Sequence, residues 1–221
     1  MMTPRLDVLP RAQQVLWPSF AQLPNGFVLY GGTALALRLG HRASVDFDFS
    51  SAKPLDADSL FALPLLRRAE TLQAEPDTLT VSVVPGGADP VKLSFFGGID
   101  IGRVGIPDRT DDNVIWIASM LDLLATKLKV LLQRVSARDY VDIAAILESG
   151  VSLADGLGAA VALYGGQFPP MEAVKALGYF AEGDAVNVEA SVRDVLVRHT
   201  QAWDRIVPAI SKADGATLGP G

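Results

Sequence analysis

The stretch that most constrains the fold is LYGGTALALRLGHRASVDFDFS, residues 29–50. It begins at the end of an apolar, β-prone run, passes through two adjacent glycines, and continues with helix-forming residues that stop at Gly40. This order predicts a buried strand over residues 26–30, a turn at Gly31 and Gly32, and then a short helix. We therefore expect a helix N-terminus at the end of a strand.

This junction of strand, glycines and helix is a candidate phosphate site. A helix N-terminus presents unpaired amides and the positive end of the helix dipole, and glycines let a phosphate approach the backbone without a Cβ in the way. Thr33 is expected to cap the helix and to offer a hydroxyl donor. Gly31, Gly32 and Thr33 are thus candidate phosphate ligands, although a glycine pair also serves in many proteins simply to turn the chain.

Asp46 and Asp48 alternate with phenylalanines in the segment SVDFDFS, which predicts a strand with both carboxylates on one face. Aspartate is depleted in strands, and two like charges on one face repel, so a bound cation would compensate them. Mg²⁺ takes oxygen ligands and retains substrate phosphates in its shell. We interpret the pair as ligands of Mg²⁺ or Mn²⁺; the alternative is a half-exposed strand whose polar face is acidic.

The rest of the N-terminal two thirds mixes both kinds of secondary structure. Residues 55–72 read as a helix that Pro64 interrupts. Residues 78–84 and 91–96 alternate as an antiparallel hairpin, and residues 113–118 read as a further strand. The pattern predicts an α+β fold in which a mixed sheet is flanked by helices.

Helical patterns dominate after residue 118. Ser119 with Asp122 and Ser136 with Asp139 have the spacing of a capping box, which predicts a helix start at each serine. Further helices are expected at residues 153–164, 171–180 and 186–203. The sequence thus predicts a helical bundle over 151–210, followed by a disordered tail over 211–221.

Composition and charge exclude several classes of protein. Cysteine is absent, so disulfides and thiolate metal sites are excluded. The net charge of −6 indicates that any contact with nucleic acid is local. His41 and Arg42 are candidates for contact with phosphate or RNA, and an exposed loop pair is the alternative. The chain shows neither a signal-peptide pattern nor an uninterrupted membrane-length apolar run, so we expect a soluble cytoplasmic protein that does not enter a membrane.

A second group of polar residues lies in the segment 122–147. Lys127 and Arg134 are seven residues apart, which is two helical turns, so we expect them to share a helix face. Both could contact one polyphosphate, lysine as a point charge and arginine as a planar fork. The alternative for Lys127 is an exposed helix lysine.

Together these two motifs resemble the AbiEii/AbiGii toxins of bacterial type IV toxin–antitoxin systems, which have the nucleotidyltransferase fold. The first motif is the Gly-Gly-Thr turn with the Asp-x-Asp strand, and the second is Lys127, Arg134 and the run Arg-Asp-x-x-Asp that ends at Asp142. The resemblance covers about residues 26–150 and implies a nucleotidyltransferase-like domain over 1–150. It implies that the glycines hold nucleotide phosphates and that Asp46 and Asp48 hold the metal.

The resemblance also implies roles in the second motif. Asp142 is expected to be an active-site carboxylate that pairs with Lys127 or acts as a base, while Asp139 has an alternative role at the helix cap. One departure concerns the strand VKLSFF, which offers Lys92 and Ser94 where such enzymes often carry a third carboxylate. The sequence therefore leaves open whether the site holds one metal ion or two.

The expected activity is Mg²⁺-dependent transfer of a nucleoside monophosphate from an NTP to an acceptor. In the family this acceptor can be the 3′ end of tRNA, and a toxin of this kind implies a cognate antitoxin protein. One alternative is a nucleotide-binding or partner-binding module whose active site has degenerated. Another is an enzyme that modifies a protein hydroxyl or a small-molecule hydroxyl.

Overall fold

The structure is a computed structural model of the protein and describes residues 1–213 and residue 218. The chain forms two compact units, each described by itself below. The first contains residues 1–102, 106–119 and 218, and the second contains residues 103–105 and 120–213. Most of the segment 211–221, predicted as a disordered tail, lies outside the described residues.

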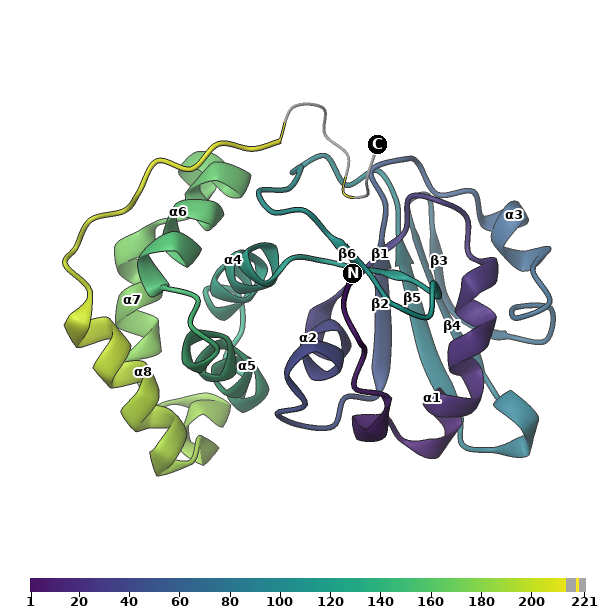
Figure 1. The fold of residues 1–221 in the computed structure, drawn as a ribbon, viewed down its shortest axis with the longest axis horizontal. Helices are drawn as coiled ribbons and strands as arrows, with labels where there is room; N and C mark the ends of the chain where they lie inside the picture. The colour runs from purple at the N-terminus through teal and green to yellow at the C-terminus, as the bar shows by residue number, and fades with distance from the viewer. Residues whose placement is uncertain (214–217, 219–221) are drawn as a thin grey trace. The chain divides into compact units, whose positions relative to one another are not determined.

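The first unit is a mixed sheet with α1 and α2 on opposite faces (Figure 1). Its helical elements are η1 (Leu6–Val8), α1 (Arg11–Leu16), η2 (Trp17–Gln22), α2 (Gly31–Leu39), α3 (Ala57–Phe61) and η3 (Pro85–Gly87). Its strands are β1 (Val28–Tyr30), β2 (Asp46–Ser50), β3 (Glu70–Glu75), β4 (Thr78–Val83), β5 (Val91–Phe96), β6 (Asp108–Arg109) and β7 (Trp116–Ile117). Within the described residues the strand order is β3-β4-β5-β2-β1-β7-β6. The predicted α+β class is confirmed.

Strand β2 lies in the middle of the sheet, antiparallel to β1 and parallel to β5. Its phenylalanines are buried and its aspartates are half-buried, as the alternation predicts. Phe20 from η2 packs on the apolar face, with ring centroids 4.6 Å from Phe47 and 5.2 Å from Phe49. This aromatic contact fixes which face of β2 is turned to the core, and the carboxylates occupy the other face.

The prediction for residues 55–72 is wrong. Only α3 is helical there, the chain turns through Pro64, and residues 70–75 form strand β3. All six residues of β3 are exposed, so no alternation of apolar and polar residues marks it as a strand. Its pairing with β4 supplies the structure that its own sequence does not indicate.

The hairpin of β4 and β5 is confirmed as antiparallel. The strand predicted over 113–118 is shorter, because regular pairing with β1 is confined to β7.

Arg38 connects helix α2 to the edge of the sheet that β6 and β7 form. Its guanidinium donates to the carbonyl oxygens of Ala118 at 2.9 Å and Ile117 at 3.2 Å, and to the Asp108 carboxylate at 2.9 Å. Burial opposes ionisation of Asp108, but the hydrogen bond and charge of Arg38 outweigh it and hold the pKa of that carboxyl below its usual range. The Arg38–Asp108 pair therefore stabilises the folded state fully above the ordinary aspartate pKa. This stabilisation is lost as the pH falls through the lowered pKa of Asp108.

The second unit is a bundle of helices (Figure 1). Its elements are α4 (Met120–Leu131), α5 (Ala137–Glu148), α6 (Leu153–Tyr164), η4 (Gly165–Gln167), α7 (Pro170–Leu177), η5 (Gly183–Asn187) and α8 (Ala190–Ala202). The helix predicted over 153–164 has the predicted bounds, and the two that follow are shorter than predicted.

The boundary between the compact units lies at Ser119, whereas the sequence places the end of the nucleotidyltransferase-like domain at residue 150. Helices α4 and α5 pack with α6 to α8 in one unit. Where the functional domain ends therefore stays a prediction.

Among residues 1–213 and 218, no single helix is long and apolar enough to cross a membrane. Helix α5 and the segment Leu153–Gln167 reach membrane-spanning length and hydropathy only when they are taken together, and the chain is bent between them.

The packing of α4 against α6 generates a stability prediction. A Cβ at Gly156 would overlap the side chain of Leu124, which is fully buried, so Gly156→Ala should force a shift in the bundle. We expect a loss of about 1–2 kcal/mol in the free energy of unfolding, because overpacking outweighs the better helix propensity of alanine. Urea denaturation measures this.

The matched control is Gly166→Ala, because a Cβ there meets nothing within 4 Å. It should change the free energy of unfolding by less than about 0.5 kcal/mol. Equal effects of the two substitutions would contradict the packing argument.

Candidate functional site

Helix α2 begins directly at Gly31, so the two glycines form its first turn and not a separate turn before it. Gly31 has φ +76°, and a Cβ there would lie 2.7 Å from Asp48 Oδ2. A Cβ on Gly32 would lie 2.5 Å from Arg42 Nη2. A carboxylate and a guanidinium occupy the space that side chains at these two positions would need, so a substitution would have to displace Asp48 or Arg42.

Thr33 does not cap the helix, contrary to the prediction. It is the third helical residue and is buried, and Tyr30 is at the N-cap position. The Thr33 hydroxyl donates to the carbonyl oxygen of Asp46 and lies 2.8 Å from Ser44 Oγ. Thr33 therefore ties helix α2 to the start of β2, and its contact with a phosphate stays a prediction.

Asp46 and Asp48 lie on one face of β2, as the alternation predicts. The register of β1 with β2 pairs Tyr30 with Asp48, which places this aspartate beside the start of α2. Asp46 Oδ2 lies 3.1 Å from Lys92 Nζ on β5. We call Gly31, Gly32, Arg42, Asp46 and Asp48 the aspartate half-site.

The aspartate half-site offers two carboxylates as candidate ligands of a divalent ion. Within the described residues, no group of three or more His, Cys, Asp or Glu side chains could hold a metal. Mg²⁺ is commonly bound through one or two carboxylates together with substrate phosphates. Two carboxylates beside a helix N-terminus fit that pattern.

His41 lies in the bend that follows α2, next to Arg42.

Lys127 is the centre of the second group. Its Nζ lies 2.7 Å from Asp139 Oδ1 and 2.6 Å from Asp142 Oδ2, and both aspartates are fully buried. Arg134 Nε donates to Asp139 Oδ2 at 3.1 Å, and its side chain is 64% exposed. We call Lys127, Arg134, Asp139 and Asp142 the lysine half-site.

One expectation about the lysine half-site is wrong, and a second is confirmed only in part. Helix α4 ends at Leu131, so Lys127 and Arg134 do not share a continuous helix face; they meet instead through Asp139. The helix start predicted at Ser136 is confirmed, since Ser136 is the N-cap of α5, but the serine makes no side-chain cap hydrogen bond. The carboxylate of Asp139 pairs with Lys127 and Arg134 instead of capping the helix.

The environment of Asp139 also affects Tyr140, which follows it. Burial raises the pKa of Tyr140, and the negative charge of Asp139 adds to the effect. The phenol lies within hydrogen-bond distance of the carbonyl oxygen of Ala176, at 3.3 Å. Tyr140 is therefore held neutral as part of the bundle that surrounds the half-site.

A model of the family described as nucleotidyl transferase AbiEii toxin, type IV TA system, matches residues 14–207. The chain belongs to this family. The match covers both half-sites, and the family expected from the motifs is confirmed.

Solved structures of nucleotidyltransferases share the fold of this AbiEii family member. A protein from H. pylori assigned to the nucleotidyltransferases has a TM-score of 0.55 at 19% identity, covering 86% of this chain and 91% of that one. MenT4, a nucleotidyltransferase toxin from Mycobacterium tuberculosis H37Rv, has a TM-score of 0.54 at 15% identity, covering 88% of this chain and 83% of that one.

A curated relative is an uncharacterized protein from Aquifex aeolicus (strain VF5), 36% identical over 122 residues. The match covers 54% of this chain and 56% of the relative, so the chain spans about half the length of that protein.

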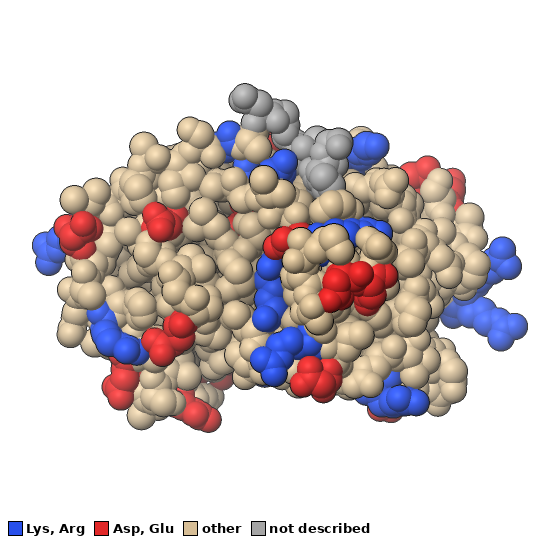
Figure 2. Space-filling view, viewed as in Figure 1, with Lys and Arg blue, Asp and Glu red and all other residues tan. Residues whose placement is uncertain are grey.

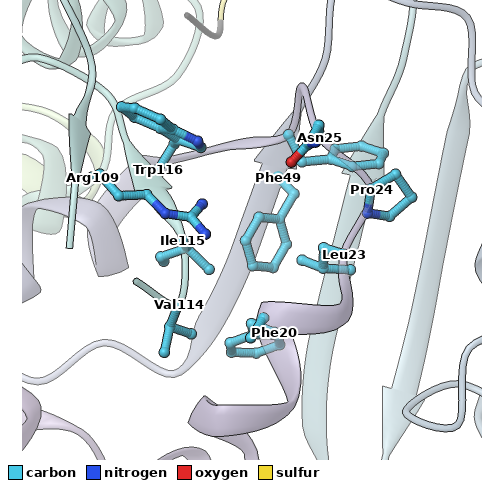
Figure 3. Close-up of a pocket in the computed structure, with 11 residues that line it drawn as sticks. Phe20, Leu23, Pro24, Asn25, Phe49, Arg109, Val114, Ile115 and Trp116 are labelled. Atoms are coloured by element: carbon cyan, nitrogen blue, oxygen red, sulfur yellow. The ribbon is translucent and has the colours of Figure 1, made fainter. Parts of the chain in front are cut away.

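The apolar face of the sheet carries a small pocket, which does not suit a nucleotide (Figure 3). Phe20, Phe49, Ile115 and Trp116 line it, and Arg109 packs 5.4 Å from the centre of the Trp116 ring. Its volume of about 30 Å³ leaves room for only a few water molecules. Phe49 and Asp48 point to opposite faces of β2, so this pocket is separate from the aspartate half-site.

Sequence reasoning undervalued Asp139 and missed Ser44. The spacing of Asp139 and Asp142 could have predicted their shared contact with Lys127, because residues three apart on a helix share a face and can hold one cation. Ser44 precedes β2 as an ordinary loop residue, and nothing in the pattern marks its contact with Thr33.

The lysine half-site generates a stability prediction. Lys127→Met should lower the free energy of unfolding by about 3–5 kcal/mol, because it leaves two buried carboxylates without their ammonium partner. Urea denaturation at neutral pH measures the loss. Lys175→Met is the control, since Lys175 pairs with Glu172 at the surface and should contribute less than about 1 kcal/mol. Similar losses for both would contradict a buried cluster.

The close approach at Gly31 generates another prediction. Gly31→Ala should destabilise the protein by about 1–3 kcal/mol more than Gly150→Ala, because only the former meets a side chain. Gly150 also has a positive φ, +100°, but a Cβ there meets nothing within 4 Å. Thermal melts of the two variants separate backbone strain from the contact with Asp48. A smaller loss at Gly31 than at Gly150 would show that Asp48 moves aside without cost.

Proposed function

We propose that the protein is a toxin that transfers a nucleoside monophosphate from an NTP to an acceptor hydroxyl and releases pyrophosphate. The observation that carries the proposal is the packing of the Asp48 carboxylate over Gly31 at the start of α2. This contact brings a candidate metal ligand next to amides that suit a phosphate. Membership of the AbiEii family gives the same reaction class.

In this proposal the acceptor oxygen forms a bond to the α-phosphorus, and the bond from that phosphorus to the oxygen that bridges to the β-phosphate breaks. Pyrophosphate leaves, and the acceptor proton passes to solvent water. A divalent ion bound with the NTP would offset negative charge on the phosphates. Asp46 and Asp48 would hold that ion. Gly31 and Gly32 offer backbone amides to the phosphates, Arg42 adds a cation beside them, and Thr33 keeps helix and strand together.

Lys127 and Arg134 are proposed to offset the charge that develops on the phosphates. Asp139 and Asp142 engage the Lys127 ammonium, so it is held in one place at little further entropic cost. The full burial of Asp142 and its contact with Lys127 favour a positioning role over that of a general base. The exposed guanidinium of Arg134 is accessible to an anionic ligand.

For the acceptor we propose the 3′ end of tRNA, and for regulation a cognate antitoxin protein. Both come from the family and not from a surface feature. Figure 2 shows acidic and basic side chains interspersed on the face in view, and the net charge is −6. RNA contact by this protein would therefore depend on local cations such as Arg42, with His41 beside it.

A second candidate is a nucleotide-binding module without turnover. The observation that favours it is the pairing of Asp46 with Lys92, together with Ser94 in register with Asp48, where a further carboxylate would complete a two-metal site. A third possibility keeps the enzyme but changes the acceptor to a protein or a small molecule.

The test is incubation of the purified protein with each α-³²P-labelled NTP, Mg²⁺ and total bacterial tRNA. We expect label on RNA with the wild type and a loss of at least about 100-fold with Asp48→Asn, which removes charge but keeps shape. Asp89→Asn, on the exposed turn between β4 and β5, is the matched control and should retain activity.

Each other outcome distinguishes the candidates. Label on protein or a small molecule would support the alternative acceptors. NTP binding without transfer to any acceptor would support the binding module. Full transfer by Asp48→Asn would exclude the role proposed for Asp48.

A further inference from the structure

Strand β5 places two polar side chains beside the aspartates of β2. The two strands run parallel, with Asp46 in register with Lys92 and Asp48 with Ser94. Side chains two residues apart on a strand share a face, so all four lie on the same side of the sheet. The register therefore fixes an ammonium next to one carboxylate and a hydroxyl next to the other.

The ion pair of Lys92 and Asp46 contributes little to stability. The two side chains are 44% and 38% exposed, and water screens pairs of this kind while the long lysine loses conformational freedom. The pair does constrain the orientation of Asp46, because one carboxylate oxygen already faces an ammonium at 3.1 Å. We therefore expect loss of the Lys92–Asp46 pair to change metal binding and not the stability of the fold.

The neighbours on β5 also limit how many cations the half-site can hold. A second divalent ion needs additional negative charge, whereas the residue beside Asp48 is the buried Ser94 and the residue beside Asp46 is a cation. One Mg²⁺ that shares its shell with substrate phosphates needs no more than the two aspartates.

We propose that Lys92 is a positioning residue that acts as a fixed cation beside Asp46 and restricts the half-site to one divalent ion. This inference rests on the proposed function and specifies how the same site holds its cation. It predicts opposite effects of removing the ammonium. Metal affinity rises because Asp46 loses a competing cation, while turnover falls because the carboxylate loses its fixed orientation. A purely structural role of Lys92 would lower both.

The test counts bound Mn²⁺ by equilibrium dialysis of the purified 221-residue chain, with and without a non-hydrolysable NTP analogue. We expect one Mn²⁺ per wild-type chain, after subtraction of ion bound to nucleotide alone. Lys92→Met should bind Mn²⁺ about three- to tenfold more tightly, the order expected for one unit charge at a water-exposed site. Its melting temperature should equal that of the wild type, which checks the fold.

Two variants serve as controls. Lys92→Arg keeps the charge and should restore wild-type Mn²⁺ affinity. Lys53→Met removes the same charge from an exposed position after β2 and should leave Mn²⁺ affinity unchanged.

The outcomes separate this inference from the proposed function. Two Mn²⁺ per wild-type chain, or unchanged or weaker Mn²⁺ binding by Lys92→Met, would overturn the role of Lys92 while metal and nucleotide binding still support the function. A wild-type chain that binds neither Mn²⁺ nor the analogue would overturn the proposed function, and the inference with it.

Discussion

The aspartate half-site depends on the space above Gly31. The antiparallel register of β1 and β2 places Asp48 beside the last residue of β1, so its carboxylate lies where a Cβ on the next residue would be. A side chain at this position would have to displace the Asp48 carboxylate and adopt a φ of +76°, which glycine adopts without strain. The hydroxyl of Thr33 then ties the same helix to the start of β2. Helix start and carboxylate are thus held together by short local contacts.

The two half-sites differ in how they hold their charges. Lys127 is enclosed by two buried carboxylates, where loss of one partner leaves buried charge with less compensation. Asp46 and Lys92 are partly exposed, so water compensates either of them when the other is removed. The lysine half-site is therefore coupled to the stability of the helical unit, whereas Lys92 and Asp46 at the aspartate half-site remain partly exposed to solvent.

The elements that could be predicted from the sequence are those with a local periodic signal. The alternation in β2, the hairpin of β4 and β5, and the helix over 153–164 all appear where predicted. Strand β3 could not be predicted, because all its residues are exposed and it has no apolar face. Asp139 was interpreted as a helix cap because the local spacing allowed it, but Lys127 is a stronger partner for a buried carboxylate.

The sequence by itself determined the α+β class, the family and the candidate residues, because periodicity and motif spacing are local properties of the chain. Tertiary structure alone decided the partners of the charged groups: Lys92 beside Asp46, and Arg134 with Lys127 on Asp139. The reason is physical. An ion pair depends on strand register, helix ends and burial, and these follow from how distant segments pack and not from the spacing of residues along the chain.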